Sequence, residues 1–368
     1  MSGRIVLFGA TGYTGGLTAR ALVDGGVRPV LAARNAERLD RLAGELGGLE
    51  TRVADVARPA TLAGLVERGD VLISTVGPFA RLGSPAVEAA IASRAHYLDS
   101  TGEGPFIRTV FERHGPPARA AGCGLLTAFG YDWVPGNLAG ELALREAGEA
   151  ATRVDIGYFT TGSAGTGAIS GGTRATLLES MGAPSYAYRG GRLVSEPPAR
   201  RVRRFDLGRR RSDAISVATS EPFTLPRLHP GLRDVGVYLG WAGPLSRAVQ
   251  AMSAATSLLG RVPGARDALR ALVRPLASTG STGGPDAEAR AKVGSLIVAE
   301  AFDARGTRLS AVRLEGVNPY DFTAAVLAWG ARTAATGGVQ GTGALGPVDG
   351  FGLEALVRGC SEAGISRT

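Results

Sequence analysis

Lysine is almost absent from this chain, and its scarcity excludes several kinds of chemistry. Lysine and arginine total 41 among 368 residues, and Lys292 is the only lysine. Schiff-base catalysis would depend on that side chain, in the polar stretch PDAEARAKVG, and a Tyr-x-x-x-Lys catalytic pair is excluded. The net charge of +8 therefore comes from arginine. Because alanine and glycine are also abundant, this charge indicates a GC-rich genome as much as a polyanion-binding protein.

Cysteine and long apolar runs are scarce as well. Two cysteines, Cys123 and Cys360, provide no disulfide framework and no metal cluster, so we expect no metal site. No run approaches the roughly 20 apolar residues that cross a bilayer. The first predicted strand starts within four residues, which leaves no room for a signal peptide. The sequence predicts a cytoplasmic protein.

The chain does contain a regular alternation of β-type and α-type segments over its first 140 residues. The segments between the β-type runs carry apolar residues at i, i+3 and i+4, as amphipathic helices do. The β-type runs are 4–9, 28–34, 50–56, 70–77, 96–101 and 122–130. This alternation predicts a parallel, doubly wound sheet of the Rossmann type, with ligands bound at the carboxyl ends of the strands.

The first strand leads into the glycines Gly9, Gly12 and Gly15, spaced as G-x-x-G-x-x-G. Gly9 allows a tight turn, Gly12 lets the backbone approach a pyrophosphate, and Gly15 lets the helix pack close to the sheet. The helix N-terminus then presents free N–H groups and a positive dipole end to the phosphates. The turn predicts a dinucleotide site.

The residues after the second and third strands indicate which dinucleotide binds. NAD sites usually place an acid after strand two, whereas this strand ends in Arg34 and Asn35, with Arg38 one turn later. A guanidinium can form a fork onto a 2′-phosphate, so we expect NADPH. Asp55 follows the third strand and either meets the adenine edge or starts a turn.

Candidate catalytic groups follow strands five and six. Hydride transfer needs a positioned nicotinamide and a proton donor. Tyr131 and Asp132, which we expect at an interdomain crevice, are the candidate donors, while Asp99 and Arg174 could orient the substrate. The alternatives are a hydrogen-bonded interdomain tyrosine and a helix-capping aspartate. No Ser-His-Asp order or zinc-ligand spacing is present.

From residue 152 the pattern changes to longer β-type stretches, which predict a largely antiparallel sheet. One such stretch is 212–225, a hairpin is expected at 299–316, and a helix at 170–182 would cover the sheet. The fold class is therefore α/β, with an inserted α+β domain. The expected domains are the dinucleotide-binding domain 1–150, the substrate domain 151–325, and a C-terminal segment 326–368 that returns to the first domain.

Two segments in the second domain, one basic and one amphipathic, allow more than one interpretation. The run Arg200–Arg211 fits an acidic carrier protein or coenzyme A phosphates, or a solvated loop or edge strand whose charges block pairing. Without a recognised nucleic-acid module, no nucleic-acid partner is expected. Segment 246–277 fits two packed amphipathic helices, a membrane-surface contact or the mouth of an apolar pocket.

Several motifs together resemble the saccharopine dehydrogenase-like oxidoreductases, in the branch that contains trans-acting enoyl reductases of bacterial polyketide-lipid synthesis. They are GATGYTG, LAAR, VGPF, HYLDSTGE and GYDWVPGNL, followed by SGGT at 170–173 and GPVDGFG at 346–352. The resemblance implies an NADP-type Rossmann domain. It places cofactor contacts at Gly9, Thr11, Gly12, Tyr13, Thr14, Arg34, Asp55, Val76, Gly77 and Pro78, to which the turn and strand two add Gly15, Asn35 and Arg38.

The resemblance implies an NADPH-dependent reductase of a conjugated C=C bond in a hydrophobic, free or carrier-linked, acyl or polyketide substrate. Thr173 and Arg174 are the expected substrate contacts. The alternatives are a C=N reductase of the saccharopine type and an NADP(H)-binding protein without catalysis. The groups that bind two amino-acid carboxylates in true saccharopine enzymes find no match here. Peripheral membrane contact and a homodimer stay open.

Overall fold

The computed structural model describes residues 3–162, 185–208, 210–241, 243–259 and 283–368. The chain divides into two compact units. Unit 1 comprises Met1–Gly102, Phe106–Val134 and Val317–Ser366, and unit 2 comprises Glu103–Pro105, Pro135–Gly316 and Arg367–Thr368. Residues 135–150, assigned to the first domain by sequence, lie in unit 2. The sequence-based domain limits themselves stay predictions.

Unit 1 is built on a seven-stranded sheet in the order β15-β6-β5-β4-β1-β2-β3, and every pairing is parallel. The strands are β1 (Ile5–Phe8), β2 (Val30–Ala33), β3 (Thr51–Val53), β4 (Val71–Ser74), β5 (His96–Asp99), β6 (Gly124–Leu126) and β15 (Gly343–Ala344). The six N-terminal strands confirm the alternation expected from the sequence. Strands β1, β2 and β4 are buried throughout, as expected for parallel strands covered on both faces.

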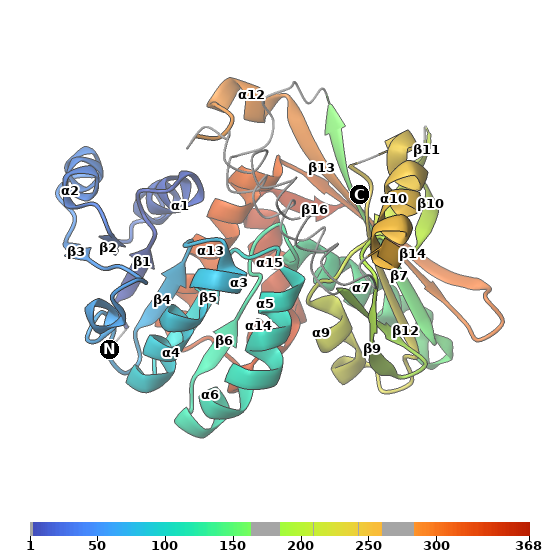
Figure 1. The fold of residues 1–368 in the computed structure, drawn as a ribbon, viewed down its shortest axis with the longest axis horizontal. Coiled ribbons are helices and arrows are strands. Elements are labelled where there is room, and N and C mark those ends of the chain that lie inside the picture. Colours follow the sequence, from blue (N-terminus) through green and yellow to red (C-terminus); the bar gives the residue numbers. More distant parts are fainter. Residues whose placement is uncertain (1–2, 163–184, 209, 242, 260–282) are drawn as a thin grey trace. The chain divides into compact units, whose positions relative to one another are not determined.

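Helices cover both faces of this sheet (Figure 1). They are α1 (Tyr13–Asp24), α2 (Ala36–Glu45), α3 (Phe79–Leu82), α4 (Ser84–Ser93), α5 (Gly104–Thr109), the π-helical turn η2 (Val110–His114), α6 (Gly115–Ala121), α13 (Pro319–Ala335), α14 (Pro347–Phe351) and α15 (Leu353–Glu362). The helical pattern after β3 gives only the 3₁₀ turn η1 (Pro59–Leu62), because Gly64 has φ +74° and ends it.

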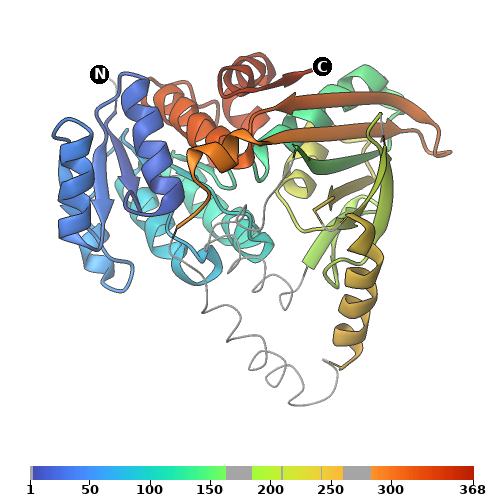
Figure 2. The same ribbon diagram turned by 90° about the horizontal axis from the view of Figure 1, so that it is seen from above.

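The C-terminal part of the chain returns to unit 1. Helix α13 lies beside α1, as Figure 2 shows. Its start is fixed by Asn318, whose Oδ1 accepts from the backbone N–H groups of Tyr320 and Asp321 at 3.0 Å each. Strand β15 then pairs with β6 and completes the sheet. The fold of the dinucleotide-binding unit therefore uses both ends of the chain.

Unit 2 is built on a second, mostly antiparallel sheet. Its main path runs β10-β11-β12-β7-β13-β14-β16, with β8 paired to β12 and β9. Strands β12 and β7 are parallel, whereas the pairings β10–β11, β11–β12, β12–β8, β8–β9, β7–β13 and β13–β14 are antiparallel. The strands are β7 (Arg153–Gly162), β8 (Ser185–Arg189), β9 (Arg192–Glu196), β10 (Val202–Asp206), β11 (Arg211–Ser216), β12 (Asp234–Leu239), β13 (Val293–Phe302), β14 (Arg308–Gly316) and β16 (Ile365–Arg367). This confirms the predicted fold class.

One helix of unit 2 corrects a sequence prediction. The helices and helical turns described for this unit are α7 (Val134–Ala147), η3 (Gly148–Ala150), α9 (Glu221–Leu228), η4 (Gly243–Leu245), α10 (Ser246–Leu259) and α12 (Ala287–Ala291). The predicted strand 212–225 is wrong beyond Ser216, because Pro222 stands in the first turn of α9, where its ring favours a helix start. The predicted helix 170–182 and residues 260–277 lie outside the described residues. No helix in the described ranges is long and apolar enough to cross a bilayer.

Candidate functional site

The turn between β1 and α1 contains three glycines. The fold requires glycine at Gly9 and Gly15 but not at Gly12. At Gly9, φ is +91°, and a Cβ there would lie 2.6 Å from Thr75 Oγ1; at Gly15 it would lie 2.9 Å from the same atom. Gly12 has an ordinary φ of −79°. A Cβ on it would meet only the Gly9 carbonyl oxygen, at 3.3 Å. The packing of the described residues therefore leaves the space in front of Gly12 open.

Helix α1 begins at this open space. Gly12 is its N-cap and supplies no side chain, so the first-turn N–H groups of the helix have no side-chain cap. The positive end of the helix dipole faces the same space, which suits an anion. Tyr13, in the first turn, packs edge-on against Tyr320 with ring centroids 5.2 Å apart. The residues present fit a dinucleotide pyrophosphate.

The residues after β2 have three different roles. Asn35 caps α2, since its Oδ1 accepts from the backbone N–H of Arg38 at 2.8 Å. The Arg38 guanidinium reaches back to the glycine turn and donates to the Thr11 carbonyl at 3.2 Å. Arg34 is exposed, and among the described residues its side chain has no hydrogen bond or ion pair. Of the three, Arg34 has the guanidinium available for a 2′-phosphate.

The residues after β3 and β4 offer the candidate site few available side chains. Asp55 forms a turn, because its Oδ1 accepts from the Ala57 N–H at 3.0 Å, which favours the turn-starting reading of this residue. Val76, Gly77 and Pro78 follow β4 and lead into α3, and Gly77 is exposed. Their predicted contact with the cofactor stays a prediction.

Asp99, at the end of β5, is completely buried. Its Oδ1 accepts from the backbone N–H groups of Thr101 and Ala128, each at 2.9 Å, and its Oδ2 accepts from Thr127 Oγ1 at 2.8 Å. Burial raises the pKa of Asp99 to about 6, and these hydrogen bonds limit the rise. Both carboxylate oxygens are therefore engaged inside unit 1, and a direct substrate contact by Asp99 stays only a prediction.

Tyr131 and Asp132 follow β6 and differ in environment. Tyr131 is 2% exposed, and its ring packs edge-on against Phe322. Asp132 is partly buried; its Oδ1 is shielded from solvent and has no hydrogen-bond partner among the described residues. Burial raises the pKa of Asp132 to about 7. Asp132 therefore holds its proton near neutral pH and is the better candidate acid.

Sequence reasoning missed residues that shape this edge of the sheet. The Thr75 side chain lies close to Gly9 and Gly15, and its hydroxyl donates to the Gly9 carbonyl at 3.2 Å. Gly102 lies against the Asp132 carboxyl group, since a Cβ there would be 2.8 Å from Asp132 Oδ2. Their positions at strand ends were a signal, but a lone threonine or glycine has no distinctive pattern.

The residues predicted in the second domain are only partly described by the structure. Thr173 and Arg174 lie outside the described residues. In the run Arg200–Arg211, several guanidiniums are paired within the chain: Arg201 with Glu196 at 2.6 Å, Arg203 with Glu300 at 2.6 Å and Arg204 with Asp213 at 2.7 Å. Strand β10, which carries part of the run, lies at the edge of its sheet. This favours the edge-strand reading.

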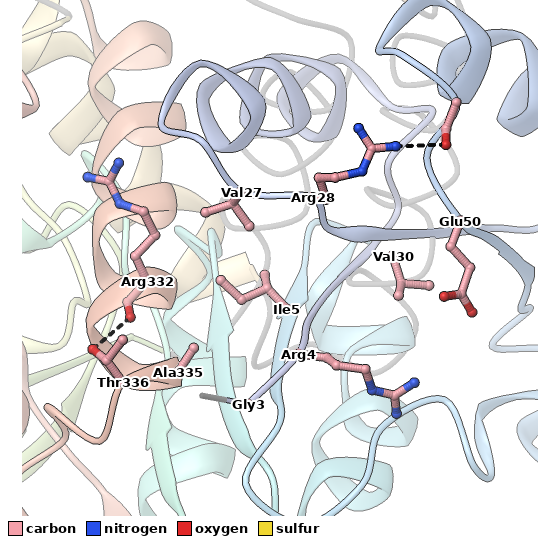
Figure 3. A pocket seen from close by; sticks show the side chains of 11 residues that line it. Gly3, Arg4, Ile5, Val27, Arg28, Val30, Glu50, Arg332, Ala335 and Thr336 are labelled. Atoms are coloured by element: carbon pink, nitrogen blue, oxygen red, sulfur yellow. Dashed lines mark hydrogen bonds between the residues drawn. The ribbon is translucent and has the colours of Figure 1, made fainter. Parts of the chain in front are cut away.

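A cavity lies at the opposite, amino-terminal ends of the unit 1 strands (Figure 3). It has a volume of about 630 Å³ and is lined by Gly3, Arg4, Ile5, Val27, Arg28, Val30, Gly48, Glu50, Arg332, Ala335 and Thr336. Its arginines have partners: Arg28 donates to the Gly47 and Gly48 carbonyls at 3.1 and 3.0 Å, and Arg332 donates to the Gly25 carbonyl at 3.4 Å. They neutralise helix C-termini, so the cavity is not an evident anion site.

Comparisons with known proteins show what this chain is similar to. Residues 5–121 match the saccharopine dehydrogenase NADP binding domain. Trans-acting enoyl reductases of Mycobacterium ulcerans and Mycobacterium leprae are 35% and 40% identical over 205 and 140 residues. These alignments cover 52% and 36% of this chain and 48% and 34% of the relatives. The chain thus spans at most about half the length of the curated relatives it matches.

The fold has a solved counterpart. Apo saccharopine dehydrogenase (L-Glu forming) from Saccharomyces cerevisiae aligns with 100% of this chain and 99% of its own, with a TM-score of 0.59 and 14% identity. This shows a shared fold. Together with the family match it confirms the resemblance inferred from the motifs, and the NADP-binding domain supports NADPH as the cofactor. Residues 5–121 of this chain are thus similar to the saccharopine dehydrogenase NADP binding domain.

Proposed function

We propose that the protein is an NADPH-dependent reductase that saturates the conjugated C=C bond of a hydrophobic acyl or polyketide substrate, free or carrier-linked. The observation that carries the proposal is Asp132, a carboxyl group with a pKa of about 7 whose shielded Oδ1 has no hydrogen-bond partner in the part of the chain that the structure describes. It follows β6 at the same carboxyl edge of the sheet that β1 ends on, where the glycine turn lies. The enoyl reductase relatives support the reaction class.

The cofactor is held by groups described above. The first turn of α1 and the open space at Gly12 accept the pyrophosphate, and Arg34 is available for the 2′-phosphate. Bound NADPH supplies a hydride to the electrophilic carbon of the double bond. Thr173 and Arg174, the substrate contacts predicted from the sequence, would orient the substrate.

Asp132 supplies the second hydrogen. As the π bond breaks, the protonated Asp132 carboxyl donates its proton to the carbon that the hydride does not reach, so that two C–H bonds form. The products are the saturated acyl group, NADP⁺ and the Asp132 carboxylate, which solvent then reprotonates. A pKa near 7 leaves roughly half of the Asp132 carboxyl groups protonated at neutral pH, against almost none at the ordinary pKa of about 4, and still allows the proton to leave.

Single-turnover reduction by the full chain tests this proposal. NADPH-loaded protein is mixed with 2-enoyl thioesters of increasing chain length and, separately, with cyclic imines, and NADPH fluorescence is followed. Faster oxidation with longer enoyl chains supports the proposal. Oxidation by imines alone would make the protein a C=N reductase. NADPH binding without oxidation by either class would favour the non-catalytic reading.

A further inference from the structure

The buried carboxylate of Asp99 joins two separate segments of unit 1. One segment is the turn after β5, whose Thr101 N–H donates to Asp99 Oδ1. The other is the loop after β6, whose Ala128 N–H donates to Oδ1 and whose Thr127 hydroxyl donates to Oδ2. The Phe129 N–H adds a bond to the Asp99 carbonyl at 2.7 Å. One residue therefore fixes the spacing between the two strand exits.

These two segments are the ones that meet at Asp132. The turn after β5 ends in Gly102, whose missing side chain leaves room for the Asp132 Oδ2 atom. The loop after β6 carries Asp132 itself, and its turn is closed by a bond from the Trp133 N–H to the Ala128 carbonyl at 2.8 Å. Ala128 is thus tied to Asp99 through its N–H and to the residue after Asp132 through its carbonyl.

Ala128 needs such an anchor. Its φ is +57°, a left-handed conformation that costs a non-glycine residue free energy and persists only where its surroundings hold it. The bond from its N–H to the buried Asp99 carboxylate supplies that restraint. Releasing it would let the loop relax and carry Asp132 away from Gly102.

We propose that Asp99 is a positioning residue, which encloses Asp132 by fixing both segments around it and acts through hydrogen-bond geometry rather than through its charge. All three donors to its carboxylate are neutral. An asparagine could keep the pattern, because its Oδ1 would still accept both backbone N–H groups. Its amide could donate to the Thr127 oxygen, since a hydroxyl both donates and accepts.

The variants Asp99→Asn and Asp99→Ala in the full chain test the inference without substrate. The readout is the titration of Asp132 by carboxyl ¹³C NMR on aspartate-labelled protein, assigned with Asp132→Asn. Wild type and Asp99→Asn should titrate near the same pH, about 7. In Asp99→Ala the pKa of Asp132 should fall toward the ordinary value of about 4, because loosened segments admit water. An unchanged titration in Asp99→Ala, or an equal fall in Asp99→Asn, would overturn the inference.

A kinetic measurement extends this test and rests on the proposed function. Asp99→Ala should lose about tenfold or more in kcat with little change in NADPH affinity, and Asp99→Asn should restore most of it. If Asp132→Asn turned over normally, the acid role would fail, and the titration would still decide the role of Asp99. Should Asp99→Ala not fold, Thr127→Val, which removes the bond to Oδ2 only, should lower the pKa of Asp132 part of the way; no change there would also contradict the inference.

Discussion

The two ends of the parallel sheet in unit 1 carry opposite kinds of polar groups. At the amino-terminal end, the cavity of about 630 Å³ is lined by arginines whose guanidiniums already donate to carbonyls or pair with acids. At the carboxyl end, the helix start at Gly12, the Arg34 side chain and Asp132 Oδ1 have no such partners among the described residues. The cavity therefore lies at the end of the sheet where the polar groups already have partners.

This difference shows how a site can be recognised without a ligand. A polar group that already has good hydrogen bonds gains little from a ligand, whereas a shielded group without them gains the most. Unsatisfied groups gathered at one strand edge therefore indicate function better than volume does. The predictions below test that distinction, beginning with the largest expected effect.

Replacing the acid at the carboxyl end should have the largest effect. Asp132→Asn should lower kcat by roughly 10²–10⁴-fold, because a general acid contributes that much, while NADPH affinity changes little. The measurement is turnover beside a cofactor titration. Tyr131→Phe serves as the matched comparison, and because its ring is 2% exposed, a smaller loss is expected. Normal turnover by both variants would assign the proton to water or to the substrate.

Closing the open space in front of α1 should come next. Gly12→Val should weaken NADPH binding about 100-fold or more by displacing several charge-assisted hydrogen bonds to phosphate, with only a modest change in Tm. Gly15→Val is the control, because its side chain would collide with the Gly9 carbonyl and should destabilise the fold itself. Wild-type NADPH binding by Gly12→Val would place the cofactor elsewhere.

The pH dependence of turnover should follow Asp132. Because the folded-state pKa is raised to about 7, the acid is protonated below that pH and is lost as pH rises through it. The kcat should therefore be level at lower pH and fall about tenfold per unit above pH 7. The stability of the wild type should also fall as pH rises, because the raised pKa of Asp132 disfavours the folded state above the unfolded-state pKa. The Tm of Asp132→Asn should therefore rise relative to that of the wild type as pH increases. A flat kcat profile would contradict the assignment.

The choice between cofactors should depend on Arg34. A charge-assisted contact with the 2′-phosphate contributes about 1.5–3 kcal/mol, so NADPH should bind roughly tenfold or more tightly than NADH. Arg34→Asp should erase or reverse this preference, as titrations with both cofactors would show. Arg38→Ala is the comparison, since its guanidinium is engaged with the Thr11 carbonyl. Equal affinities in the wild type would end this claim.

The smallest effect is expected at the cavity. Arg28→Ala removes two hydrogen bonds to carbonyls at an exposed site and should cost about 1 kcal/mol of unfolding free energy, with kcat and NADPH affinity unchanged. Chemical denaturation and steady-state kinetics measure the two effects. A loss of turnover without a loss of stability would break the comparison between the two ends of the sheet.

Most of the fold could be predicted from the sequence, because in unit 1 the spacing of apolar residues along each segment matches the strand or helix that the segment forms. Strands β1 and β2 are continuous apolar runs and β4 is apolar up to Ser74, whereas β3, with the sequence Thr-Arg-Val, was recognised from its place in the alternation. Strand β15 was not predicted, because two residues, Gly343 and Ala344, carry no pattern and pair only once β6 is in place. Helix α9 was predicted as a strand, because its apolar residues alternate and only Pro222 indicates a helix start.

The candidate site was predictable in position but not in detail. Strand ends led to Gly12, Arg34 and Asp132, since ligands in such sheets bind at the carboxyl edge. The cap made by Asn35 and the close approach of Gly102 to the Asp132 carboxyl group depend on neighbours that only the folded chain brings together. Sequence therefore identified the edge, and the structure separated the groups with partners from those without.

The return of the C-terminal segment affects how the protein is made. Unit 1 draws on Met1–Gly102, Phe106–Val134 and Val317–Ser366, so the ribosome synthesises Pro135–Gly316, most of unit 2, before it synthesises the last segment of unit 1. During synthesis β6 has no partner on its outer edge until Gly343 and Ala344 emerge. Domains generally fold in the order of their synthesis, but here most of the inserted unit is available before the unit that begins the chain is complete. A nascent chain stalled before Pro319 would lack the helix that packs beside α1 and would present that surface to chaperones.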